Sequence, residues 1–197
     1  FATGEKTYKR AIGVSKDSLP IPSIIETLQQ KGYQSGLVSL TPITHATPGA
    51  FYAHVKDRDS HEEIALDLID ANIDFFAGGG LKYLKRRKDK KDLYAALLAK
   101  NYQLDSVALS PYNIHKRNGY LLANDGLPSK LEGRKSFFQD ATQLGLDYLT
   151  EKEKPFFLMI EGSYIDWGGH AMDAELLKQE VLDFDKTLGV VLNYIKM

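Results

Sequence analysis

Side chains that could bind a metal gather directly after an apolar run near the end of the chain. The run 155–160 is followed at once by Glu161, and then by Asp166 and His170 among several glycines. A carboxylate at the end of a buried strand calls for a cation, because an uncompensated buried charge is costly. The Asp-x-x-x-His spacing can bring a carboxylate oxygen and an imidazole nitrogen to one side of a helical turn. These residues therefore indicate a metal site, with a surface ion pair as the alternative for Asp166 and His170.

A second polar cluster follows an earlier apolar run. The segment 41–50 places Thr44, His45 and Thr47 between two prolines. Proline stiffens a loop, so these side chains are held in place, as suits a binding site. The alternative is local, because Thr44 or Thr47 could cap a helix that begins near Pro48.

Four further features of the sequence give weaker indications of function. Arg58 could bind an anion, since a guanidinium matches phosphate oxygens, but alone it resembles a surface arginine. The glycines at 78–80 lack any phosphate-binding motif around them and are interpreted as a structural turn. The charged run 85–91 is interpreted as a solvated loop or helix end, with a binding patch as the alternative, and 127–134 as a surface loop.

Composition excludes several classes of protein. The chain has 197 residues, 43% of them hydrophobic, which is enough for one packed core. Its 25 Lys and Arg balance 26 Asp and Glu, so charge gives no attraction to nucleic acid or to an anionic membrane. No apolar run approaches the roughly 18 residues that span a bilayer. There is no cysteine, so a metal here must bind His, Asp, Glu or hydroxyl oxygen.

Helical and strand patterns alternate along the chain and indicate an α/β fold with a mainly parallel sheet. The sequence predicts helices at 22–31, 62–72, 93–100 and 137–149, strands at 33–40, 73–77, 102–109 and 156–160, and an amphipathic helix at 182–197. Ser23 is the expected cap of the first helix, and Leu182, Leu188, Val191, Leu192 and Ile195 form the apolar stripe of the last. In such sheets ligands bind beyond the carboxyl ends of the strands, where both polar clusters fall.

Taken together, these motifs resemble those of alkaline phosphatases. The resemblance covers essentially the whole chain in order, and its most specific element is Glu-Gly-x-x-x-Asp-x-x-x-His within a series at 3–8, 46–48, 54–58, 78–80 and 156–170. It implies a three-layer α/β/α sandwich and hydrolysis of small-molecule phosphate monoesters through a phosphoserine intermediate. It also implies two zinc ions and one magnesium ion as cofactors.

The resemblance assigns roles to five residues. Thr47 and Glu161 match magnesium ligands, Asp166 and His170 match two ligands of a zinc, and Arg58 matches the arginine that holds the substrate phosphate. The residue types suit these roles, because Mg²⁺ prefers oxygen ligands whereas Zn²⁺ accepts imidazole together with carboxylate.

Two positions differ from some bacterial members of the family. His45 stands where those members have an aspartate, and Trp167 stands where they have a lysine near the phosphate. The resemblance implies weaker outer support for magnesium and one cation fewer near the phosphate.

The family's nucleophilic serine and several of its metal ligands have no match in this chain. The first residue is not Met and no terminator follows the last helix, so residues 1–197 are expected to be part of a catalytic domain, inactive alone. The family further implies a homodimer in the periplasm or outside the cell. A related phosphodiesterase or sulfatase, and a non-catalytic metal-binding domain, remain as alternatives.

Overall fold

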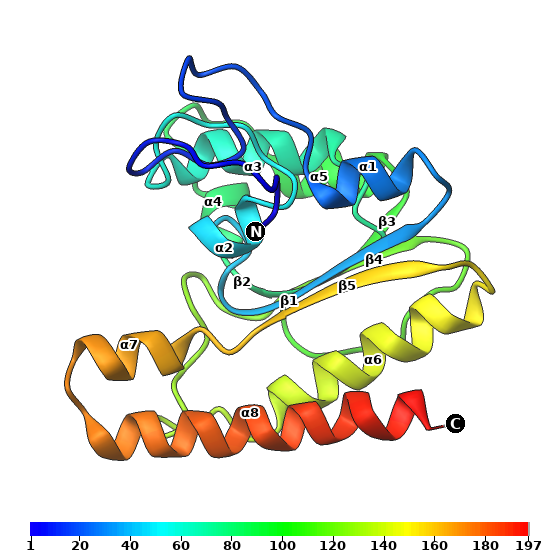
Figure 1. The fold of residues 1–197 in the computed structure, drawn as a ribbon. Coiled ribbons are helices and arrows are strands. Elements are labelled where there is room, and N and C mark those ends of the chain that lie inside the picture. The colour runs from blue at the N-terminus through cyan, green and yellow to red at the C-terminus, as the bar shows by residue number, and fades with distance from the viewer. Residues whose placement is uncertain (197) are drawn as a thin grey trace.

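The computed structural model describes residues 1–196, which form a five-stranded sheet flanked by helices (Figure 1). All four strand pairings are parallel, and the strand order is β3-β4-β2-β1-β5. The strands are β1 (Gln34–Pro42), β2 (Phe75–Gly79), β3 (Tyr102–Asp105), β4 (Arg117–Leu121) and β5 (Phe156–Glu161). The α/β class and the parallel sheet predicted from the sequence are confirmed.

Helices cover both faces of the sheet (Figure 1). One face carries α1 (Ile24–Gln29), α2 (Ala46–Gly49), α3 (His61–Asp70), α4 (Leu81–Lys85) and α5 (Leu93–Ala99). The other carries α6 (Phe137–Glu151), against which α8 (Ala174–Ile195) packs, and α7 (Tyr164–His170) lies between β5 and α8 along the chain. Among residues 1–196, no helix is both long and apolar enough to cross a membrane.

Two apolar cores lie on opposite faces of the sheet. Successive side chains of a strand point to opposite faces, so Leu37 of β1 joins the core under α1 to α5, while Val38 joins the core under α6. Both side chains are fully buried. This two-sided burial explains why the central strand β2 consists only of apolar residues and glycine.

The first helix begins as its sequence predicts. Ser23 is the N-cap of α1 and receives the backbone N–H of Glu26, whose carboxylate accepts the backbone N–H of Ser23 in return. This reciprocal pair satisfies two donors that a helix start leaves open.

The last helix differs from its prediction. It begins at Ala174 rather than at 182, with Asp173 as its N-cap. The predicted apolar stripe does not enter a core, because Leu182, Leu188, Leu192 and Ile195 are all more than 40% exposed. The face of α8 that is buried carries polar residues instead, namely Glu180, Asp183 and Thr187.

Two local interpretations were wrong in their boundaries. Gly78 and Gly79 belong to β2, where a side chain on Gly79 would meet the Asp125 carbonyl at 1.8 Å. Gly80 alone makes the turn, with φ at 101°. The strand predicted over 102–109 ends at Asp105, whose carboxylate accepts the backbone N–H groups that follow it.

Two segments interpreted as solvated loops bury an arginine. In the run 85–91, Arg87 is 6% exposed and donates to the carbonyls of Glu62 and Tyr83 and to Asp89. In the segment 127–134, Leu127, Ser129 and Arg134 are all buried. Charge-rich sequence suggested solvent in both places, but a guanidinium can be buried where enough acceptors surround it.

Candidate active site

The carboxyl ends of β1 and β5 bring the first group of candidate residues together. The two strands pair in parallel with Ser39 opposite Glu161. Ser39 Oγ donates to Glu161 Oε2 at 2.7 Å, and Thr41 Oγ1 lies 3.4 Å from the same oxygen. Neighbouring residues in register point to the same face of the sheet, so the fold itself places hydroxyl donors around this carboxylate. Glu161 is therefore held in one position and is only partly exposed.

The loop after β1 and the helix after β5 meet at His45. Arg58 Nη2 lies 3.5 Å from His45 Nε2, and the ring of Trp167 in α7 packs edge-on with its centroid 5.9 Å from that of His45. Figure 1 shows α2 and α7 at this same end of the sheet. Burial lowers the pKa of His45, although the charge of Glu161 acts in the opposite direction. A neutral imidazole is the form that can accept a hydrogen bond or bind a metal.

His45 Nδ1 is buried and has no hydrogen-bond partner within residues 1–196. The alternative in which Thr44 or Thr47 caps a helix is wrong: His45 is the N-cap residue of α2 and makes no capping bond with its side chain. Thr44 Oγ1 instead lies 3.0 Å from His61 Nδ1. Buried polar atoms in folded proteins are nearly all paired, so His45 Nδ1 is open to a ligand or an ordered water.

A second imidazole, which the sequence did not single out, stands beside the first. His61, the first residue of α3, stacks on Tyr83 at 4.3 Å and lies 6.4 Å from the His45 ring. Burial lowers its pKa as well. No motif in the sequence marks His61, because its position depends on how α3 and α4 pack beside the loop after β1.

The second group of candidates lies on α7. His170 Nε2 is 3.6 Å from Asp166 Oδ1, as the four-residue spacing predicts, and the two side chains are 81% and 74% exposed. Thr47 is also exposed, on α2. Within the described part of the chain, no three His, Asp or Glu side chains converge as a complete metal site. The structure thus places the candidates beyond the carboxyl ends of β1 and β5, with Asp166 and His170 forming the exposed ion pair that was the alternative to a metal site.

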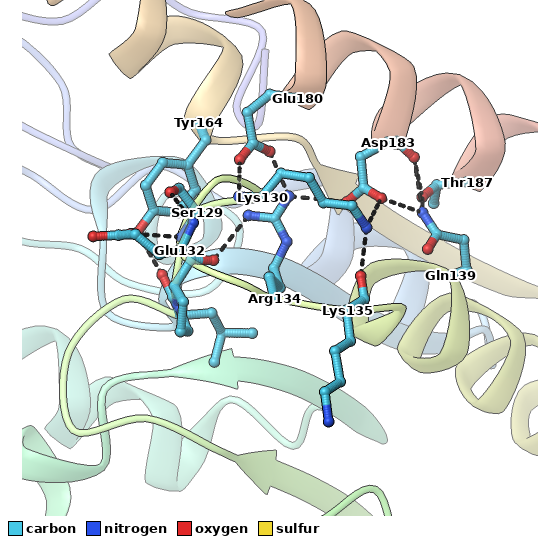
Figure 2. Close-up of polar contacts among 12 residues, drawn as sticks. Ser129, Lys130, Glu132, Arg134, Lys135, Gln139, Tyr164, Glu180, Asp183 and Thr187 are labelled. Atoms are coloured by element: carbon cyan, nitrogen blue, oxygen red, sulfur yellow. Dashed lines mark hydrogen bonds and ion pairs between the residues drawn. The ribbon is translucent and has the colours of Figure 1, made fainter. Parts of the chain in front are cut away.

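A buried ionic cluster joins the segment 127–134 to α8 (Figure 2). Arg134 donates to Glu180 and, at 2.9 Å, to Asp183, and Lys130 Nζ pairs with Asp183 at 2.7 Å. Arg134 and both carboxylates of α8 are nearly inaccessible to solvent. We call these four residues the Arg134 cluster.

The Arg134 cluster also reaches α7. The guanidinium of Arg134 lies 5.5 Å from the ring centre of Tyr164, the first residue of α7, and Tyr164 donates its hydroxyl proton to the carbonyl of Leu127. The segment 127–134, the start of α7 and the buried face of α8 are therefore joined in one network, which the sequence analysis missed. The signal available was a polar residue every three or four positions in α8, at 180, 183 and 187.

Comparison with known proteins assigns the chain to a family. The family model for alkaline phosphatase matches residues 1–197. The chain belongs to the alkaline phosphatase family. Alkaline phosphatase 4 of Bacillus subtilis is 34% identical over the whole of this chain and 44% of its own length. The alkaline phosphatase of Escherichia coli is 26% identical, again over the whole of this chain, and 53% of its own length is covered.

Solved alkaline phosphatase structures share the fold. The enzyme from the Antarctic bacterium TAB5 superposes with a TM-score of 0.96 and is 42% identical, covering 100% of this chain and 58% of that one. A mutant of the TAB5 enzyme, with aspartate in place of a histidine, has Mg bound in its M3 site. This alkaline phosphatase family chain spans about half the length of the relatives it matches. The resemblance deduced from the motifs is confirmed.

Proposed function

We propose that this chain supplies one part of a metal-dependent phosphomonoesterase site within a longer alkaline phosphatase. The observations that carry the proposal are the hydrogen bond of Ser39 to Glu161 and the contact of Arg58 with His45, which lie beyond the carboxyl ends of the paired strands β1 and β5. A fixed carboxylate, a neutral imidazole and a guanidinium are the groups that a metal ion and a phosphoryl group require. This arrangement and membership in the family support hydrolysis of small-molecule phosphate monoesters as the activity of the longer protein.

The donor types fit the metals that we assign to them. Glu161 and Thr47 would hold magnesium through oxygen, and the oxygen-rich surroundings of Glu161 agree with that choice. Asp166 and His170 would hold zinc, for which a carboxylate and an imidazole on adjacent helical turns are suitable donors. When bound, the metals would stabilise charge on the attacking and leaving oxygens of the phosphoryl group.

Arg58 would bind the oxygens of the substrate phosphate. Its side chain is exposed, and the only hydrogen bond of that side chain within residues 1–196 is a 3.5 Å contact with His45, so its fork of donors is free for an anion. In the full-length protein a serine outside this chain would attack the phosphorus and form the phosphoserine intermediate. The chain alone is then inactive, because it holds the arginine but not the nucleophile.

His45 and Trp167 would tune the site. The imidazole brings no charge where an aspartate would bring one, and the indole replaces a lysine that would attract the phosphate. Replacement Trp167→Lys should therefore raise phosphate affinity in the full-length enzyme. Unchanged affinity would contradict this role for Trp167. The family further suggests a homodimeric enzyme that works in the periplasm or outside the cell.

Metal titration of the chain tests the assignment. Calorimetric titration with Zn²⁺ and Mg²⁺ should show saturable binding, weakened at least about tenfold for zinc by His170→Ala and for magnesium by Glu161→Gln. His115→Ala and Glu175→Gln, at exposed positions elsewhere, are the matched controls. Equal binding by all five proteins would contradict the assigned ligands. Turnover of an aryl phosphate by the chain itself at alkaline pH, abolished by His170→Ala, would contradict its predicted inactivity.

A further inference from the structure

A second polar pocket lies at the opposite edge of the sheet. Its volume is about 540 Å³, and its lining residues lie near the first residues of the strands rather than near their last residues. Figure 1 shows the turn from α1 into β1 and the turn from α6 into β5 at this end, far from α7. The residues that matter for its chemistry are Gln34, Asp74, Arg117, Lys152 and Lys154.

Three cations face this pocket with few partners of their own. Within residues 1–196, neither Lys152 nor Lys154 forms an ion pair or a side-chain hydrogen bond, and Arg117 Nε comes no closer than 3.9 Å to Asp74 Oδ1. Surface lysines usually point into solvent, but Lys152 lies over the ring of Tyr148 at 4.9 Å. Burial lowers the pKa of Lys152. The charges of Arg117 and Lys154 also lower it, whereas the charge of Asp74 raises it. The pocket thus carries more positive charge than its one carboxylate balances.

The same pocket contains a buried acceptor that lacks a donor. Gln34, at the start of β1, is 5% exposed, and its side-chain oxygen has no hydrogen-bond partner within the described residues. Asp74 is a second acceptor, of which one oxygen receives the backbone N–H of Ser35 at 3.0 Å. Burial raises the pKa of Asp74. A buried oxygen without a donor is costly, so it favours a ligand that brings a hydrogen.

We propose that this pocket binds inorganic hydrogen phosphate. Its charged oxygens would pair with Arg117, Lys152 and Lys154, and its remaining P–O–H group would donate to the side-chain oxygen of Gln34. Charge-assisted bonds from lysine and arginine supply the affinity, and the donor to Gln34 supplies the selectivity. Sulfate has the same shape and charge but no hydrogen to donate at neutral pH, so Gln34 and Asp74 oppose it. The pocket does not depend on the proposed phosphatase function, because it shares no residue with the carboxyl edge of the sheet.

Phosphate titration of the metal-free chain, with chelator present, tests the proposal. Binding of inorganic phosphate should be saturable and should weaken about tenfold in Lys154→Ala and again in Lys152→Met, as each removes one charge-assisted bond. Lys135→Ala, at an exposed lysine elsewhere, should bind phosphate as the unaltered chain does. Circular dichroism of each variant confirms that it is folded.

Titration with sulfate tests the selectivity of the pocket for phosphate. Its affinity should be at least about tenfold lower than that of phosphate in the unaltered chain, and Gln34→Met should reduce this difference. The proposal is overturned if the chain binds no phosphate, if Arg58→Ala abolishes binding while Lys154→Ala preserves it, or if sulfate binds as tightly as phosphate. A failure of metal binding in the earlier titration, with phosphate binding intact here, would remove the proposed function and leave this pocket standing.

Discussion

Two adjacent helices carry charged side chains that differ in their exposure to solvent. On α7, Asp166 and His170 stand 3.6 Å apart with most of their surface in solvent. On α8, Glu180 and Asp183 are almost completely buried and bonded to Arg134. Buried charges that satisfy one another stabilise a fold only as a complete set, whereas exposed charges are free to meet a ligand. The difference separates residues that hold this edge of the molecule from residues that are available for chemistry.

The largest effect should follow from breaking the buried set. Arg134→Met leaves Glu180 and Asp183 buried without their guanidinium, so the free energy of unfolding should fall by about 3–5 kcal/mol. Urea denaturation followed by circular dichroism measures this change. Because Arg134 also packs near Tyr164, the near-ultraviolet signal of the aromatic residues around α7 should change as well.

Two further variants sharpen that result. Lys135→Met makes the same kind of change at the next residue, whose side chain is exposed, and should alter stability by less than about 0.5 kcal/mol. Glu180→Gln combined with Asp183→Asn in the Arg134→Met background removes the stranded charges and should recover part of the loss. A loss of stability in Lys135→Met as large as in Arg134→Met would refute the role of the Arg134 cluster.

The next effect concerns the carboxylate that we assign to magnesium. Ser39→Ala removes the closest hydroxyl donor to Glu161, a bond of 2.7 Å from a fully buried side chain, and should lower stability by about 1–3 kcal/mol in metal-free buffer. Ser136→Ala removes a similar bond, to Asp140 at 2.6 Å, from an exposed position. It should lower stability by much less, and equal losses in the two variants would show that burial does not strengthen the Ser39 bond.

The sequence predicted the fold more fully than the site. Strand and helix periods are local properties, so the alternation, the Ser23 cap and the parallel sheet followed from them. Glu161, at the end of an apolar run, was recognised for the same reason. The hydroxyl of Ser39 was missed because its contact spans 122 residues and depends on the register of β1 with β5.

The Arg134 cluster was missed for a related reason. Its arginine lies in a segment that resembles a surface loop, and its carboxylates lie 46 and 49 residues away on a helix whose apolar stripe suggested a different buried face. Patterns of hydrophobicity predict which face of a helix is buried only when that face is apolar. On α8 the fully buried residues are polar and four of the five residues of the predicted apolar stripe are exposed, so the pattern gave the wrong face.

A smaller effect should come from a pair of intermediate exposure, His54 with Glu26. Burial lowers the pKa of His54, but its bonds to the Gly13 carbonyl and to Glu26 outweigh burial and raise it. Burial raises the pKa of Glu26, and bonds to Ser23 and His54 outweigh that effect and lower it. The histidine therefore stabilises the fold fully below about pH 6.5 and loses this contribution as pH rises further, while the glutamate contributes above about pH 4.3.

The pair should thus be strongest between these two values. His54→Gln should lower stability by about 0.5–1 kcal/mol near pH 5.5 and by less near pH 8.5. Urea denaturation at both values measures the difference, with His115→Gln at an exposed position as the control. A stability loss that grows with rising pH would have the wrong sign for this account.

The smallest effect on stability should come from the α7 pair itself. An ion pair at 3.6 Å between two largely exposed side chains is screened by water and salt, so His170→Ala should change the free energy of unfolding by less than about 0.5 kcal/mol. The same variant should give the loss of zinc binding described above. The two measurements together test the comparison between α7 and α8. Replacing a residue that holds the fold lowers the stability of the protein, whereas replacing a residue of the site lowers its affinity for the ligand. A destabilisation by His170→Ala that approaches that of Arg134→Met would place the α7 pair with the structural charges of α8.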